Sequence, residues 1–180
     1  MTLRCSVFCA VSLDGFIARK DGALDWLKPA EADLPPADSG FDAFMASVDC
    51  VVMGRNTFEI VLPMSETWFY SKPVYVLTTR PLALPERLKD KVESGRHSPR
   101  EIVALMEKRG AKRLYVDGGK TIQEFLNAGL IDDLVITRIP VLIGVGIPLF
   151  GPLAKDVRVA LESSRVLAGG AVQSTYRVVR

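Results

Sequence analysis

The chain has 180 residues, of which 48% are hydrophobic and 24% charged, and its formal net charge is +2. This composition is typical of a soluble globular protein and predicts a single domain over residues 1–180. The basic residues are scattered, which argues against a nucleic-acid-binding surface. The sequence has no signal-peptide pattern and no apolar run near the ~20 residues of a membrane span. We therefore expect a cytoplasmic protein with neither nucleic acid nor membrane as a partner.

The cysteines give no indication of a metal site or a disulfide framework. Cys5, Cys9 and Cys50 all lie in apolar stretches, and no C-x-x-C pair occurs. An odd number of cysteines without that spacing is not typical of zinc ligands or paired thiols. We expect three buried thiols in a reducing compartment and no bound metal.

The chain begins with a predicted strand and a series of turns. Residues 4–12 form an apolar run with Val and Phe, which is typical of a buried strand. Asp-Gly pairs at 14–15 and 21–22 predict turns. The stretch over residues 28–40 is rich in Pro and irregular. Loops of that length often cover or bind a ligand.

A helix is predicted after this loop. Phe41, Phe44 and Met45 have the i, i+3, i+4 spacing of one helix face. Ser39 is the expected N-cap, and Asp42, three residues later, is its expected capping-box partner.

Strands and helices then alternate to the end of the chain. Pro140 predicts a break in the long strand at residues 133–143. The alternation predicts an α/β three-layer sandwich: a mostly parallel, mixed central sheet with helices on both faces and a C-terminal antiparallel hairpin. The remaining predicted elements are strands at residues 50–54, 73–79, 113–117, 157–167 and 172–179, and helices beginning near residues 55, 99 and 121.

Three predicted strands end in residues that suit an anion. Residues 118–121 join a strand to a helix through two glycines, where free backbone N–H groups attract negative charge. Residues 54–57 make a similar junction, with an Arg and a Thr that could contact phosphate. Residues 77–80 place two hydroxyls and a guanidinium at a strand end. Each alone is also compatible with a turn, a cap or a polar strand end, and for residues 77–80 the polar strand end is favoured, but together the three suit a dinucleotide.

The Gly-Lys-Thr at residues 119–121 is not a complete P-loop. Leu114 stands where that motif requires its first glycine. No G-x-G-x-x-G follows the first strand, so the Rossmann fingerprint is also absent. An ATP-using P-loop enzyme is therefore disfavoured.

Four blocks of sequence carry a family resemblance. In chain order they are VSLDGFIA with DGALDW, then VVMGRNTFE, VYVLTTR and YVDGGKTIQEFLNAGLIDDLVITRIPVLIGVGIPLFG. They resemble the dihydrofolate-reductase-like superfamily, most closely the reductase (C-terminal) domain of the bifunctional riboflavin-biosynthesis deaminase-reductase and its stand-alone relatives. The match spans nearly the whole chain. Gly144-Val145-Gly146 departs from the consecutive glycines of many relatives, and no zinc-deaminase motif occurs, so we do not expect a bifunctional chain.

The resemblance implies an NADPH-dependent reductase that transfers a hydride to a planar acceptor, such as a pterin, a riboflavin precursor or an imine-like sugar adduct. Residues 78–80 would surround the adenosine 2′-phosphate, and residues 54–57 and 118–121 the pyrophosphate. The backbone of residues 9–11 would bind the nicotinamide carboxamide, beneath a loop at residues 12–25. The implied cofactor-binding residues are Ala10, Val11, Gly54, Arg55, Asn56, Thr57, Leu77, Thr78, Thr79, Arg80, Asp117, Gly118, Gly119, Lys120 and Thr121.

Candidate catalytic residues follow from the same resemblance. Dihydrofolate reductases carry a buried acid on the first helix, for which Asp38 and Asp42 are candidates here, although both also suit a helix cap. Asp14 is either a turn residue or a carboxylate beside the nicotinamide. The only histidine, His97, is expected on the surface.

Expected substrate contacts come from Phe16, Trp26, Phe41, Met45 and Phe58, although Met45 suits the core equally well and Trp26 could instead pack beneath the loop. A small-molecule substrate is the expected partner. The family and the apolar C-terminal hairpin also suggest a homodimer. A non-catalytic NADP-binding module is the alternative function.

Overall fold

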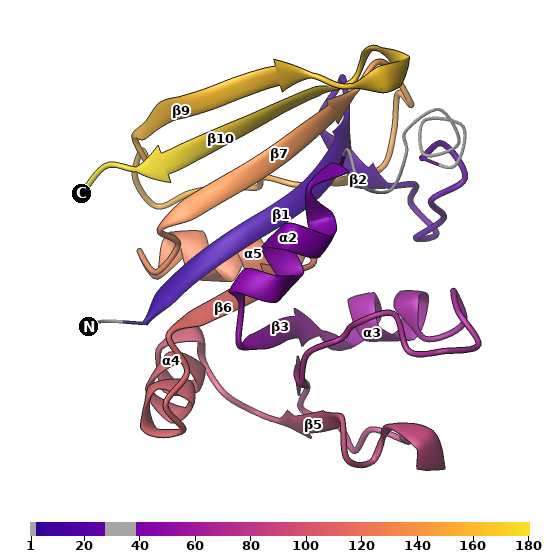
Figure 1. Cartoon of the computed structure of the whole chain (residues 1–180), viewed down its shortest axis with the longest axis vertical. Helices are drawn as coiled ribbons and strands as arrows, with labels where there is room; N and C mark the ends of the chain where they lie inside the picture. Colours follow the sequence, from indigo (N-terminus) through magenta and orange to yellow (C-terminus); the bar gives the residue numbers. More distant parts are fainter. Residues whose placement is uncertain (1–2, 28–38) are drawn as a thin grey trace.

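The computed structural model describes residues 3–27 and 39–180 of the chain (Figure 1). The strands are β1 (Arg4–Ser12), β2 (Phe16–Ala18), β3 (Cys50–Gly54), β4 (Val74–Leu77), β5 (Val92–Gly95), β6 (Arg113–Asp117), β7 (Asp133–Ile139), β8 (Ile147–Pro148), β9 (Val159–Val166) and β10 (Val172–Val178). The helices are α2 (Phe41–Ser47), α3 (Arg55–Val61), α4 (Pro99–Lys108) and α5 (Gly119–Asn127), with short 3-10 turns η2 (Glu86–Leu88) and η3 (Ala168–Gly170).

An eight-stranded mixed sheet forms the centre of the fold. Its order is β5-β4-β3-β6-β1-β7-β10-β9, and neighbours from β5 to β7 run parallel. β10 lies antiparallel to both β7 and β9, which confirms the predicted C-terminal hairpin. β1 pairs with β6 over Arg4–Ser6 but with β7 over Ser6–Ser12. Beyond Ser6, the ladder contacts of β1 among the described residues are therefore with β7 alone.

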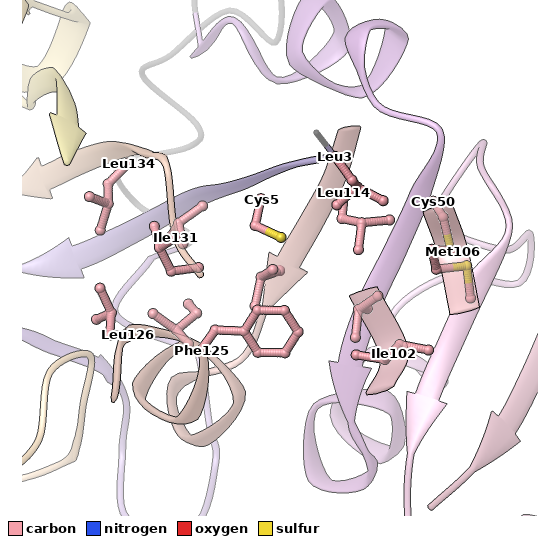
Figure 2. Close-up of a cluster of buried hydrophobic side chains, with 14 of the residues drawn as sticks. Leu3, Cys5, Cys50, Ile102, Met106, Leu114, Phe125, Leu126, Ile131 and Leu134 are labelled. Carbon is pink, nitrogen blue, oxygen red and sulfur yellow. The ribbon is translucent and has the colours of Figure 1, made fainter. Parts of the chain in front are cut away.

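Helices cover both faces of this sheet, as the sequence predicts. Figure 1 shows α2 on the near side of the sheet and α5 behind it. On the α4 and α5 side, Ile102 and Phe125 are fully buried, and Figure 2 shows Phe125 beside Cys5. On the α2 and α3 side, Phe44 and Phe58 pack in a second core. Burying a side chain of this size contributes about 1.5–3 kcal/mol.

The first residues of the helices test two capping predictions. Ser98 caps α4 as expected: it accepts the backbone N–H of Glu101, whose side chain accepts the N–H of Ser98 at 2.7 Å. The capping box expected at the start of α2 is wrong. Gly40 is the N-cap there, without a side-chain cap, because Ser39 Oγ accepts the N–H of Phe41 instead, at 3.2 Å.

The break predicted at Pro140 is confirmed: β7 ends at Ile139, because Pro140 has no N–H to donate to a ladder. β5 and β8 were not predicted. β8 pairs antiparallel with β2 in a separate two-stranded sheet, which the Leu149 N–H extends by donating to the Gly15 carbonyl at 3.1 Å.

The cysteines are free, and Cys5 and Cys50 are buried, whereas Cys9 is half-buried. Burial raises the pKa of the Cys5 and Cys50 thiols to about 12, so both are unreactive at neutral pH. Within residues 3–27 and 39–180, no cluster of three or more His, Cys, Asp or Glu side chains could hold a metal ion. None of the described helices combines the length and the apolar composition that a bilayer crossing requires.

Candidate functional site

A cleft of about 480 Å³ opens at the carboxyl ends of β3 and β4. Its walls come from those strand ends, the first turns of α3 and α5, the β2–β8 sheet and the turn after β5. The lining residues are Ile17, Ala18, Gly54, Arg55, Asn56, Thr57, Ile60, Leu77, Thr78, Thr79, Arg80, Arg96, His97, Gly119, Lys120, Thr121, Glu124 and Ile147.

The cleft brings together most of the residues expected at the cofactor. Residues 54–57, 77–80 and 119–121, which are distant in the sequence, all line it. Ala10, Val11, Asp117 and Gly118 lie outside its lining. Ala10 and Val11 lie on β1, where the ladder partners are Thr137 and Arg138 of β7.

Two glycines allow the turns that precede α3 and α5 to interlock. A Cβ at Gly118 would lie only 2.1 Å from Oγ1 of Thr57, and the φ of Gly118 is +88°. A Cβ at Gly54 would lie 3.0 Å from Oγ1 of Thr121. Each threonine therefore occupies the space left by the glycine of the other turn. Packing therefore requires a glycine at Gly118, whereas a side chain at Gly54 would be a tight fit.

The first turn of α5 presents backbone N–H groups to the cleft. Its N-cap, Gly118, has no side chain to accept a hydrogen bond from them. Gly119 lies against the β2–β8 sheet, since a Cβ there would be 2.9 Å from Cδ1 of Ile17. The lack of a side chain at Gly119 therefore lets the first turn of α5 pack closely against this small sheet.

The charges around the cleft favour an anion. Arg55, Arg80, Arg96 and Lys120 line it, against a single acidic residue, Glu124. A concave surface with an excess of one charge concentrates ligands of the opposite sign.

Arg55 is held by the protein itself. Its Nε donates to Glu59 at 2.6 Å, and one terminal nitrogen donates to the Pro81 carbonyl at 3.1 Å. These bonds tie α3 to the turn after β4. The expected contact of Arg55 with a phosphate would therefore have to compete with the existing partners.

The turns after β4 and β5 are fastened side by side. The Thr78 N–H donates to the Gly95 carbonyl at 3.0 Å, and Thr78 Oγ1 accepts the Arg80 N–H at 3.2 Å. His97 Nδ1 lies 3.1 Å from the Tyr75 hydroxyl. The surface position expected for His97 is wrong, because this contact holds the half-buried ring at the cleft wall. Arg96 and His97 were missed because β5 was not recognised.

Asp14 fastens two loops together. Its carboxylate is exposed and accepts hydrogen bonds from the Ser12 hydroxyl at 2.6 Å and from the Gly144 N–H at 2.7 Å. These hydrogen bonds hold the pKa of Asp14 below its ordinary value, and the bond from the Ser12 hydroxyl has the largest effect. The arrangement supports the interpretation of Asp14 as a turn residue.

The acid expected on the first helix is not found at Asp42. Asp42 is exposed on α2, and Asp38 lies outside the described residues. The catalytic role expected for Asp38 therefore stays a prediction.

Three of the side chains expected at the substrate are buried instead. Phe58 is 1% exposed and Met45 4%, because the apolar faces of α3 and α2 point into the core. Trp26 is 6% exposed and packs against Ile139 and Leu167. The substrate contact expected of Phe58 is therefore wrong, whereas Met45 and Trp26 have the packing roles that were their alternative interpretations. Phe16 and Phe41 are half-buried.

An aromatic cluster that the sequence did not reveal surrounds Phe41. Its ring centroid lies 5.5 Å from those of Phe8 and Phe69, and Phe69 is 49% exposed. The ring of Tyr70 stands perpendicular to that of Phe69, with centroids 5.0 Å apart, and the centroids of Tyr70 and Tyr115 are 6.3 Å apart. These rings come from β1, α2, β6 and the segment between α3 and β4, so no local pattern could have predicted their meeting.

Asp117, expected at the cofactor, faces this aromatic cluster. The Tyr70 hydroxyl donates to its Oδ2 at 2.5 Å, and the Gly118 N–H donates to its Oδ1 at 2.8 Å. Burial raises the pKa of Asp117 above its ordinary value, and the hydrogen bonds offset only part of that effect.

The fold is that of dihydrofolate reductase. The structure of dihydrofolate reductase from Enterococcus faecalis, complexed with NADP(H), superposes on 98% of this chain and 97% of its own. The TM-score is 0.65 at 20% sequence identity.

The chain belongs to the RibD C-terminal domain family, whose sequence profile matches residues 5–173. A solved protein from Shewanella sp. PV-4, provisionally named for riboflavin biosynthesis, is 43% identical with a TM-score of 0.91, over 99% of this chain and 100% of that one. The diaminohydroxyphosphoribosylaminopyrimidine deaminase/5-amino-6-(5-phosphoribosylamino)uracil reductase of Thermotoga maritima is 17% identical, with a TM-score of 0.73. That match covers 99% of this chain and 57% of the Thermotoga chain.

The interlocked turns predict a large effect of Gly118→Ala. The new methyl group would collide with Thr57, and the backbone at this position has a conformation that residues with side chains rarely adopt. The free energy of unfolding should therefore fall by about 2–4 kcal/mol. Gly129→Ala is the matched control, because its φ is +69° but nothing lies within 4 Å of a Cβ there. Urea unfolding followed by circular dichroism measures both. Adding Thr57→Ala to Gly118→Ala should recover part of the loss, and equal losses at Gly118 and Gly129 would contradict the interlock.

The hydrogen bonds of Asp14 predict a pH-dependent stabilisation. A lowered pKa means that the carboxylate stabilises the fold above the ordinary Asp value of about 3.9, and that this contribution is lost as the pH falls through the lowered value. Asp14→Asn should lower the melting temperature at pH 7, with a difference from the wild type that shrinks in acid. Asp21→Asn, in the neighbouring Asp-Gly turn, is the control. A difference that persists undiminished at pH 2 would refute the assignment.

Proposed function

We propose that the chain is an oxidoreductase: an NADPH-dependent reductase that acts on a small planar heterocyclic or imine-like acceptor. The observation that carries this proposal is the cationic cleft. It is lined both by the first turn of α5, which begins at Gly119, and by Thr78, Thr79 and Arg80 after β4. Membership of the RibD C-terminal domain family and the dihydrofolate-reductase fold support it.

The residues of the cleft fit NADPH. Lys120, Thr121 and the backbone of Gly119 line the cleft at the first turn of α5 and would hold the pyrophosphate there. Arg80 and Arg96, on the two fastened turns, would hold the adenosine 2′-phosphate. When bound, the dihydronicotinamide supplies a hydride.

The nicotinamide would lie toward the carboxyl end of β1. Beyond Ser6 this strand forms its ladder with β7, so backbone groups of Ala10 and Val11 can meet a carboxamide on the side toward β6. The β2–β8 sheet, through Ile17 and Ile147, forms an apolar wall of the cleft and would exclude water from a bound cofactor.

The acceptor class follows from the family and from the aromatic cluster. A protein of this fold in Thermotoga maritima is a 5-amino-6-(5-phosphoribosylamino)uracil reductase. The exposed ring of Phe69 and the half-buried ring of Phe41 would stack on a planar heterocycle of that kind, or on a pterin.

A non-catalytic NADP-binding module is the alternative, and the exposure of Asp42 favours it, because the acid expected on the first helix is not found there. NADPH absorbance at 340 nm separates the two functions. Oxidation with 5-amino-6-(5-phosphoribosylamino)uracil or dihydrofolate would support the reductase. Tight NADPH binding without oxidation across a broad panel of pyrimidines and pterins would support the module.

Arg80→Ala tests the cofactor assignment. Losing one charge-assisted contact should cost about 1.5–3 kcal/mol, or roughly a 10- to 150-fold weaker affinity for NADPH. The affinity for NADH, which has no 2′-phosphate, should change little. Titration of the quenching of tryptophan fluorescence measures both affinities, and Arg87→Ala, on η2 outside the cleft, is the control. Equal losses for NADPH and NADH would overturn the 2′-phosphate assignment.

We also propose that the chain forms a homodimer through an apolar groove beside the C-terminal hairpin. The groove has a volume of about 380 Å³, and Phe150 at its edge is 49% exposed. Apolar surface of this kind on a soluble protein commonly marks an interface. The lining residues are Leu126, Leu134, Ile136, Arg138, Phe150, Leu153, Val157, Val159, Val172, Ser174 and Tyr176.

A charge in this groove should dissociate the dimer. Phe150→Glu is expected to give a monomer in size-exclusion chromatography with light scattering, because a carboxylate cannot be buried unpaired in an apolar interface. Met64→Glu, equally exposed after α3 and outside the groove, is the control and should remain dimeric. A wild-type chain that is monomeric at all concentrations would refute the proposal.

A further inference from the structure

The small β2–β8 sheet depends on α5 for support. Its strands have only three and two residues, and their register shifts between Phe16 and Ala18. A two-stranded sheet of this size is not stable alone and needs packing against another element. Gln123 of α5 provides such a contact, because its Nε2 donates to the Pro148 carbonyl at 3.1 Å and to the Leu149 carbonyl at 3.2 Å. The end of β8 is therefore fastened to the helix through its backbone.

The chain leaves room for the Gln123 amide at Gly151. A Cβ on Gly151 would lie 2.6 Å from Oε1 of Gln123 and 2.9 Å from its Cδ. The glycine therefore lets the backbone after β8 lie directly against the side-chain amide, while Nε2 donates to the two carbonyls. Gln123 and Gly151 are two parts of one contact, and either can be changed without the other.

The same segment forms part of the cofactor cleft. Ile147 of β8 lines the cleft together with Ile17 of β2 and the first turn of α5. A Cβ at Gly119 in that turn would lie 2.9 Å from Cδ1 of Ile17 and 3.1 Å from the Pro148 carbonyl oxygen. The carbonyl that accepts from Gln123 thus lies against the turn at which we place the pyrophosphate, whereas Gln123 itself lies outside the lining of the cleft.

We propose that Gln123 is a positioning residue that holds the β2–β8 wall over the bound cofactor and thereby slows its release. The inference rests on the proposed reductase function, because it takes the cleft to be the NADPH site. Gln123 acts through the Pro148 carbonyl and does not touch the cofactor. The wall side chains, Ile17 and Ile147, are apolar and make no contact that depends on a 2′-phosphate. The effect should therefore be the same for NADPH and NADH.

Asn127 supplies a matched control on the same helix. It lies one turn after Gln123, its Nδ2 donates to the Pro152 carbonyl at 3.2 Å, and its Oδ1 accepts the Ala154 N–H at 3.0 Å. Asn127 thus makes two hydrogen bonds to the segment after β8, as Gln123 does, but to residues outside the lining of the cleft. Asn127→Ala should therefore loosen this segment without moving the wall.

Two substitutions remove the Gln123 contact in different ways. Gln123→Glu keeps the shape of the side chain, but a carboxylate has no hydrogen to donate and repels the two carbonyl oxygens. Gly151→Ala leaves Gln123 in place and displaces its flexible amide, since the new methyl group needs the space of Oε1. Agreement between the two variants excludes an effect peculiar to either.

Release of the cofactor measures this role directly. Stopped-flow mixing of the loaded chain with excess NADP+, followed by the recovery of tryptophan fluorescence, gives the dissociation rate. Gln123→Glu and Gly151→Ala should each release NADPH and NADH about 3- to 10-fold faster than the wild type, as expected for the loss of about one net hydrogen bond. Asn127→Ala should release both at the wild-type rate.

Amide hydrogen exchange tests the wall without any cofactor. The Leu149 N–H donates to the Gly15 carbonyl at 3.1 Å, so its exchange reports whether the end of β8 is seated on the turn before β2. Gln123→Glu should speed this exchange about 3- to 10-fold, the same factor as for release, and Asn127→Ala should leave it unchanged. An unchanged rate in Gln123→Glu would overturn the positioning role, whether or not a dinucleotide binds.

The outcomes separate this inference from the proposed function. A wild-type chain that binds NADPH, with release rates unchanged in Gln123→Glu and Gly151→Ala, would refute the role of Gln123 and leave the reductase standing. Equal acceleration by Asn127→Ala would attribute the effect to general loosening of the segment and also refute that role. A wild-type chain that binds neither dinucleotide would refute the cofactor assignment and, with it, retention by the wall.

Discussion

The contact between Gly118 and Thr57 sets the geometry on which the cleft depends. Because the threonine fills the space where a side chain would stand, the turn before α5 and the turn before α3 come closer than ordinary residues permit. The reciprocal contact of Gly54 with Thr121 fixes the second half of the junction. Two helices that begin on neighbouring strands are thus locked by shape alone, and the cleft exists before any ligand arrives.

The carboxyl edge of the sheet offers two different electrostatic environments only a few residues apart. On one side of the Gly118–Gly119 turn, guanidinium and ammonium groups line an open cleft. On the other side, a carboxyl and two phenols share an apolar surrounding in which the described residues place no cation. The first environment stabilises fixed negative charge, whereas the second disfavours charge altogether.

Local chemistry could be predicted from the sequence, and long-range packing could not. The capping box at Ser98 depends on residues within one turn, so its pattern was sufficient. The turns at residues 54–57, 77–80 and 119–121 could be located because each motif is contiguous. β5 was missed because only Val92 of its residues is buried, which leaves no apolar alternation. The partners of Asp117 come from remote segments, and its protonation depends on them.

The pairing of β2 with β8 has a consequence for synthesis of the chain. One wall of the cleft joins residues 16–18 to residues 147–148, and β1 needs β7 as its lateral neighbour. Contacts of such sequence separation form late, since a long loop must close first. A ribosome-bound chain that has not yet exposed residue 148 cannot complete the wall. Molecules that end before residue 148 therefore lack this wall of the cleft.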